Sequence, residues 1–167
     1  AEDRILLYDA AFQPIVDLGT GAIEGFEGLV RLTSAHGHTI GPAEFIPVAE
    51  NSGMIDAIGS WTLRTACKQL RAWRDAGLPP VRVSVNFSSR QMQQASIAAE
   101  ILGLLSEFDV DPSQLELEVT ETSILVQTEQ VLQVLNRLKS VGVNLALDDF
   151  GVGFSSLRHL TWLPIDE

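Results

Sequence analysis

The alternation of strand-like and helix-like segments in the second half of the chain constrains the fold most. Apolar residues recur at every second position in residues 81–87, 115–121 and 143–149. These segments are separated by residues 96–108 and 126–142, where apolar residues recur at helical spacing. Strands that alternate with helices predict a parallel sheet with right-handed crossover connections. The sequence therefore predicts an α/β fold.

The first half of the chain predicts a hairpin followed by two helices. Residues 11–18 and 22–32 are typical strands, and the turn LGTG joins them. Residues 41–53 have proline near their start and end in glycine, which predicts a short helix, and residues 54–77 predict a longer one. Another helix is expected to begin at Ser155. Since there is no repeat or long linker and 46% of the 167 residues are hydrophobic, we expect one domain over residues 1–167.

Each predicted strand carries a polar residue near its carboxyl end, on the face opposite its aliphatic residues. Successive side chains of a strand point to opposite faces, so Asn86, Glu118 and Asp148 share no face with the neighbouring valines and leucines. A closed parallel barrel explains this pattern, because its active site lies at the carboxyl ends of the strands. We expect Glu27 to join the other three there, with Asp149 on the following loop.

Converging carboxylates point to a cation. Carboxyl groups held together either have raised pKa values or bind a positive ion. All-oxygen ligands favour magnesium, manganese or calcium, whereas zinc favours histidine or cysteine, and neither residue type lies at a strand end. Any single residue of this kind is more often a helix cap or an ion-pair partner. The recurrence of the pattern at several strand ends favours a metal site.

The net charge of −11, from 22 acidic and 11 basic residues, argues against a DNA-binding surface. Such a chain also repels a nucleotide unless a cation stands between them. No apolar run is long enough to cross a membrane, and the N-terminus lacks the features of a signal peptide. The single cysteine, Cys67, fits a reducing compartment and is expected to be buried. Trp61 and Trp73 are expected to pack within a helix layer, and Ser88 and Ser89 to cap a helix.

Five segments in order resemble the EAL family of cyclic di-GMP phosphodiesterases. They are FQPIVDLGTGAIEGFEGLVR, GPAEFIPVAENSGMI, SVNFSSRQ, LELEVTET and LALDDFGVGFSSLRHLTWLPID. The Glu-Ala-Leu that names the family is here Glu27-Gly28-Leu29. The resemblance implies a modified TIM-like (β/α)8 barrel whose first strand is antiparallel to the rest. It also implies hydrolysis of cyclic di-GMP to linear pGpG with Mg²⁺ or Mn²⁺.

The resemblance also implies roles for individual residues. The residues that it assigns to metal binding are Glu27, Asn86, Glu118, Asp148 and Asp149, with Asp149 on a second metal. The four acidic members of this set, Glu27, Glu118, Asp148 and Asp149, are expected to be catalytic. Gln13 and Arg31 resemble substrate contacts, and Glu121 resembles the glutamate that stabilises the loop after Asp149.

The chain departs from the family pattern at three points. Gly28 replaces alanine, and Val152 and Phe154 replace threonine and tyrosine. The sequence ends at Glu167, before the strands that carry a catalytic lysine and a further metal-binding glutamate in the family. We therefore expect the N-terminal two-thirds of a barrel, truncated at its C-terminus. We favour a portion of a longer protein over a swapped oligomer or a naturally shortened, inactive relative.

The leading functional hypothesis is a metal-dependent phosphodiesterase domain within a larger signalling protein. The alternative is an inactive cyclic di-GMP receptor or protein-interaction module, and a third is an unrelated barrel enzyme with carboxylates on magnesium. The family implies a homodimer or attached sensory or diguanylate cyclase domains. It also implies a cytoplasmic location, with any membrane anchor outside this chain.

Overall fold

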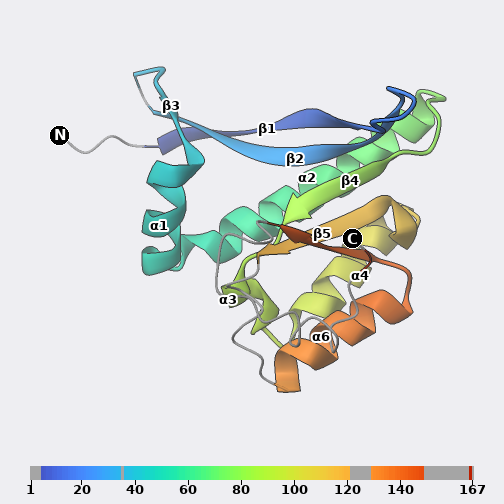
Figure 1. The fold of residues 1–167 in the computed structure, drawn as a ribbon. Coiled ribbons are helices and arrows are strands. Elements are labelled where there is room, and N and C mark those ends of the chain that lie inside the picture. Colours follow the sequence, from blue (N-terminus) through green and yellow to red (C-terminus); the bar gives the residue numbers. More distant parts are fainter. Residues whose placement is uncertain (1–4, 35, 121–128, 149–165, 167) are drawn as a thin grey trace.

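The computed structural model describes residues 5–34, 36–120, 129–148 and 166, and Figure 1 shows their arrangement. The strands are β1 (Ile5–Val16), β2 (Ile23–Ser34), β3 (Thr39–Ile40), β4 (Arg82–Asn86), β5 (Leu115–Thr120) and β6 (Asn144–Asp148). The helices are α1 (Pro42–Ser52), α2 (Met54–Asp75), α3 (Ser89–Met92), α4 (Ile97–Glu107) and α6 (Glu129–Ser140), with a 3-10 turn, η1 (Pro112–Gln114), before β5.

All six strands belong to one sheet, in the order β1-β2-β4-β5-β6, with β3 paired to β2. β1 and β2 are antiparallel, whereas β2, β4, β5 and β6 are parallel neighbours. This confirms the predicted α/β class and its antiparallel first strand. Within the described residues the sheet stays open, as expected for an incomplete barrel. Figure 1 shows α2, α4 and α6 covering one face of the sheet.

The core lies between the parallel strands and these helices. Aliphatic residues at alternate positions of β4, β5 and β6 point into this core, as the period of two predicts, and six of them are almost fully buried. The buried strand residues are Val83, Val85, Leu115, Leu117, Val119 and Leu145. α2 contributes Leu63, Cys67 and Leu70 to the same core, and Trp73 packs against the ring of Phe26, with 4.7 Å between ring centroids. The opposite face of each strand is left for polar residues.

The element boundaries differ from the predictions where local pattern is weak. The hairpin strands are 12 residues each, longer than expected, because β1 and β2 stay paired from Ile5 to the turn. The two-residue strand β3 has too little sequence to show a period and was not predicted. The helix expected from Ser155 lies outside the described residues. None of the described helices is long and apolar enough to cross a membrane.

Cys67 is expected to be unreactive in the folded protein. The residue is fully buried in α2, and burial raises the pKa of its thiol to about 11. Because the thiolate is the reactive form, its population at pH 8 falls about a hundredfold relative to a thiol of pKa 9.0. We expect an aromatic disulfide reagent to label Cys67 only after urea unfolds the chain. Labelling at the rate of free cysteine in native buffer would contradict this burial.

Candidate active site at the carboxyl ends of the strands

The sheet brings the predicted polar residues to one face. Glu27 lies within β2, and Asn86, Glu118 and Asp148 lie at or near the ends of β4, β5 and β6. Asn86 is the direct neighbour of Glu118 in the parallel register. Asp148 pairs with Thr120, which lies two residues after Glu118 on β5. Because paired residues of adjacent strands point to the same side, these side chains share one face. This is the convergence that the strand-end pattern predicted.

Glu27 and Asn86 are in direct contact. The Nδ2 atom of Asn86 donates a hydrogen bond to Oε1 of Glu27 over 3.0 Å. Glu27 is half-buried, while Asn86 is exposed at the end of its strand. The amide of Asn86 therefore fixes the Glu27 carboxylate at the opening above the sheet.

The raised pKa of Glu118 indicates that negative charge is concentrated at the strand ends. Its pKa is raised to about 7, first by burial and then by the negative charge of Glu27. Asp148 raises it further, while a hydrogen bond with Ser84 acts in the opposite direction. A carboxylate with these neighbours is stabilised by a positive ion.

Of the remaining predicted residues, the structure describes Gln13 and Arg31 but not the residues that follow β5 and β6. Gln13 pairs with Glu27 across the hairpin and so stands next to it on the same face. Arg31 lies four residues beyond Glu27 on β2, where it is half-buried and its Nη1 atom donates to the carbonyl of Val30 over 3.4 Å. Asp149 and Glu121, together with Val152 and Phe154, lie outside the described residues.

The donor set fits a hard divalent cation in its chemistry. Glu27, Glu118 and Asp148 offer carboxylate oxygens, and Asn86 offers an amide oxygen, which are the ligand types that Mg²⁺ and Mn²⁺ prefer. Among the residues that the structure describes, no three acidic, histidine or cysteine side chains lie close enough together to hold a metal ion. Asp149 is not among those residues.

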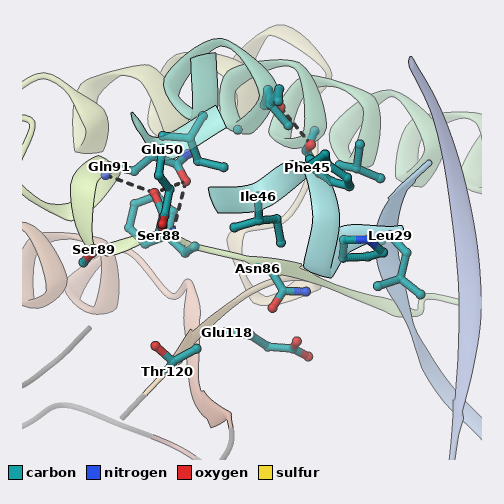
Figure 2. A pocket seen from close by; sticks show the side chains of 18 residues that line it. Leu29, Phe45, Ile46, Glu50, Asn86, Ser88, Ser89, Gln91, Glu118 and Thr120 are labelled. Carbon is teal, nitrogen blue, oxygen red and sulfur yellow. Dashed lines mark hydrogen bonds between the residues drawn. The ribbon is translucent and has the colours of Figure 1, made fainter. Parts of the chain in front are cut away.

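An apolar cleft of about 310 Å³ opens beside these residues. Figure 2 shows Asn86 and Glu118 pointing into the space below Ile46 of α1. Leu29 of β2 and Phe45 of α1 line the cleft as well. An apolar wall beside a few polar groups is the usual composition of a small-molecule site. The sequence pattern gave no indication of this wall, because it is formed by the packing of α1 over the strand ends.

The turn after β4 is held by a capping box. Ser88 is the N-cap of α3 and its Oγ accepts a hydrogen bond from the backbone N–H of Gln91, while Gln91 Oε1 accepts from the N–H of Ser88 over 3.1 Å. The prediction that Ser88 caps a helix is confirmed, whereas Ser89, predicted with it, is the first residue of α3. Because Asn86 lies two residues before this cap, the cap also fixes the backbone that carries Asn86.

Three polar residues below the strand ends were not predicted as a group. Glu116 is buried, its Oε2 lies 3.0 Å from Nη1 of Arg82, and its Oε1 accepts a hydrogen bond from Ser84 Oγ over 2.6 Å. The period of two places Glu116 on the face of Glu118 and Ser84 on that of Asn86. The same period places Arg82 on the face of Ser84 and Asn86. The sequence pattern therefore contained enough information to group Arg82, Ser84 and Glu116.

Comparison with known proteins decides the family. The EAL domain family matches residues 8–167 of this chain. The chain belongs to the EAL domain family. A solved structure of the PaMucR phosphodiesterase in complex with c-di-GMP covers 96% of the chain with a TM-score of 0.89 and 36% sequence identity. The resemblance inferred from the five segments is therefore confirmed.

Curated relatives of this chain are much longer proteins. The cyclic di-GMP phosphodiesterase NbdA of Pseudomonas aeruginosa is 40% identical over 165 residues, which are 99% of this chain and 21% of NbdA. An uncharacterized signaling protein of Caulobacter vibrioides is 40% identical over 167 residues, 20% of its length. The chain thus spans about a fifth of these relatives and 65% of the solved PaMucR chain.

Proposed function

We propose that this chain is part of a phosphodiesterase that hydrolyses cyclic di-GMP to linear pGpG with Mg²⁺ or Mn²⁺. The observation that carries the proposal is the position of Glu118. It lies among Glu27, Asn86 and Asp148 at the strand ends, under a concentration of negative charge that a cation relieves. The relatives named phosphodiesterases support the choice of substrate.

In this proposal the carboxylates hold metal and the remaining residues hold substrate. Glu27, Asn86, Glu118 and Asp148 are the metal ligands, and Asp149 binds a second metal. When bound, the metals activate a water molecule and stabilise the charge on the phosphate. The five ligands therefore do their work by placing those ions beside the scissile phosphodiester.

The remaining residues of the site are proposed to contact the phosphate and the base of the substrate. Arg31 supplies a planar cationic fork for a phosphate, and Gln13, next to Glu27, supplies an amide. The apolar cleft beside Asn86 offers a surface for a planar base. Glu121 stabilises the loop that follows Asp149. The acidic chain can then approach an anionic substrate because metal stands between them.

The relatives also suggest the setting of the domain. Since they are about five times longer than this chain, we propose that it works as the N-terminal two-thirds of an EAL barrel in a larger signalling protein. Attached sensory or diguanylate cyclase domains, or a second copy of the chain, are its proposed partners. We also propose a cytoplasmic location, which the family resemblance implies.

The direct test is turnover with and without metal. The protein is incubated with cyclic di-GMP and Mg²⁺ or Mn²⁺, and pGpG is measured by chromatography. We expect pGpG to appear with either metal and to stop when EDTA is added, because chelation removes the ions that activate water. Loss of cyclic di-GMP at an unchanged rate in EDTA would overturn the metal-dependent mechanism.

One observation favours a second function, a receptor that binds cyclic di-GMP without cleaving it. Among the described residues, no three acidic, histidine or cysteine side chains lie at metal-binding distance from one another, while the cleft beside Asn86 has a mainly apolar lining that suits a planar base. A receptor of this kind would bind cyclic di-GMP in EDTA, measured by calorimetry, and would give no pGpG with either metal. The phosphodiesterase predicts turnover in the same samples.

A further inference from the structure

A buried polar layer, formed by Arg82, Ser84 and Glu116, lies on the face of the sheet that carries the strand-end residues. Ser84 precedes Asn86 by two residues on β4, and Glu116 precedes Glu118 by two residues on β5. Ser84 is 0% exposed and Glu116 is 2% exposed. A buried carboxylate is costly unless it is paired and hydrogen-bonded, so the partners of Glu116 constrain where it can lie.

The partners of Glu116 lie on the neighbouring strand β4. The Oγ atom of Ser84 donates a hydrogen bond to Oε1 of Glu116 over 2.6 Å. The other carboxylate oxygen, Oε2, lies 3.0 Å from Nη1 of Arg82 and has no hydrogen-bond donor among the described residues, so the ion pair compensates its charge. Glu116 therefore ties β5 to two successive positions on one face of β4.

The hydrophobic pattern alone does not determine how β4 and β5 are aligned. A shift of one residue would turn the valines and leucines out of the core, but a shift of two residues leaves each of them on the core face. In the observed register Ser84 pairs with Glu116, and Asn86 pairs with Glu118. A shift of two residues in either direction separates both pairs and takes the buried Glu116 carboxylate away from its hydrogen-bond donor.

The proposed metal ligands depend on this alignment. Asn86 lies opposite Glu118 and donates to Glu27 over 3.0 Å. The backbone N–H of Phe87 donates to the carbonyl of Glu118 over 2.8 Å. Any displacement of β5 along β4 therefore moves Glu118 away from Asn86 and Glu27 together.

We propose that Glu116 is a positioning residue, whose bonds to Ser84 and Arg82 fix the alignment of β4 with β5 and so hold Glu118 opposite Asn86 as a divalent cation requires. This inference rests on the proposed metal-dependent function. Mg²⁺ requires near-ideal octahedral geometry, so ligands from two strands bind it together only when those strands are aligned. The apparent affinity for the ion falls with the fraction of molecules in the binding-competent arrangement.

The test replaces the whole layer, because removal of one member would leave a buried charge unpaired. Arg82→Met, Ser84→Ala and Glu116→Leu are combined in one triple variant. We expect its urea midpoint in EDTA to stay near that of the parent, since apolar residues of similar size commonly replace a buried ion pair without loss of stability. Its Kd for Mn²⁺, measured without substrate by electron paramagnetic resonance of the free ion, is expected to rise about tenfold, the value for a competent fraction of about a tenth.

The amide of Phe87 reports the alignment without any metal. We expect its N–H, followed by NMR in EDTA, to exchange at least about tenfold faster in the triple variant, because its bond to the Glu118 carbonyl is no longer held. The N–H of Leu63, which is buried in α2, is expected to exchange at the parent rate. Equal acceleration of both amides would show a loss of overall stability and would overturn the positioning role.

A conservative variant and a distant ion pair supply the controls. Glu116→Gln keeps an oxygen that accepts from Ser84, so its Kd for Mn²⁺ is expected to stay within about threefold of the parent value. Arg64→Met with Glu107→Leu removes an exposed ion pair of 2.6 Å between α2 and α4, and this double variant should bind Mn²⁺ like the parent.

Failure of the positioning role and failure of the proposed function give different results. A triple variant with the parent Kd for Mn²⁺ and the parent exchange rate at Phe87 overturns the positioning role and leaves the proposed function standing. A parent protein that does not bind Mn²⁺ overturns the proposed function, and with it the role of Glu116 in holding metal ligands, even where exchange at Phe87 shows that the layer aligns the two strands.

Discussion

Replacing Glu118 with glutamine is expected to abolish Mn²⁺ binding and to lower hydrolysis of cyclic di-GMP by at least about a hundredfold. Glutamine keeps the size of the side chain but removes its negative charge, and a hard cation binds a neutral amide far less tightly than a carboxylate. Glu118 lies centrally in the set, since both Glu27 and Asp148 act on its pKa. Loss of this ligand therefore affects the whole cation site rather than one edge of it.

The stability of the metal-free variant distinguishes loss of a ligand from loss of the fold. The pKa of Glu118 is raised from 4.5 to about 7, mainly by burial. A raised carboxyl pKa costs nothing below pH 4.5, where both folded and unfolded chains are protonated, and the cost is fully present above pH 7. At pH 8 in EDTA we therefore expect Glu118→Gln to unfold at a temperature equal to or above that of the parent.

An acidic residue away from the site supplies the control for this experiment. Glu129→Gln changes the same charge in the first turn of α6, where the side chain is exposed. Its Mn²⁺ binding and turnover are expected to match the parent. Full Mn²⁺ affinity in Glu118→Gln would show that the strand-end carboxylates are not the cation ligands, whatever the turnover rate.

Part of this site was predictable from the sequence because successive side chains of a strand alternate between the two faces of the sheet. The strand residues alternate strictly, so the positions of Asn86 and Glu118 on a common face followed from counting, and the parallel register made them neighbours. The direct contact of Asn86 with Glu27 was harder to predict, because it depends on the pairing of β2 with β4 and the two residues are 59 positions apart in the sequence. The antiparallel direction of β1 followed both from the hairpin pattern around the turn LGTG and from the family resemblance.

The cleft and the buried layer below it were not predicted, for two different reasons. The apolar wall of the cleft requires α1 to pack over the strand ends, and helix docking of that kind leaves no local pattern. The sequence shows Arg82 and Glu116 as charged residues within strands, but a charged strand residue is equally compatible with an exposed position. Only their burial shows that they must compensate each other.

Gly59→Ala is expected to lower the free energy of unfolding by about 2 kcal/mol and to reduce metal-dependent turnover as well. A Cβ atom at Gly59 would lie 2.0 Å from Nε2 and 2.5 Å from Cδ of Gln91, so the Gln91 side chain would have to move. Gln91 is 3% exposed and holds the N-cap Ser88. Overpacking costs about 1–3 kcal/mol and a lost cap about 1 kcal/mol, against a gain of about 1 kcal/mol from alanine in a helix.

A double-mutant cycle tests whether the clash with Gln91 is the cause. Gln91→Ala alone should cost about 1 kcal/mol through loss of the cap, but in the Gly59→Ala background it should cost nothing or restore stability, because it removes the group that the new methyl meets. Gly103→Ala in α4 is the control, since no atom beyond its chain neighbours and the backbone of its own helix lies within 4 Å of its Cβ position, and it should stabilise the protein by up to about 1 kcal/mol. Urea unfolding measures all four variants. Additive effects of Gly59→Ala and Gln91→Ala would refute the steric coupling between α2 and the capping box of α3.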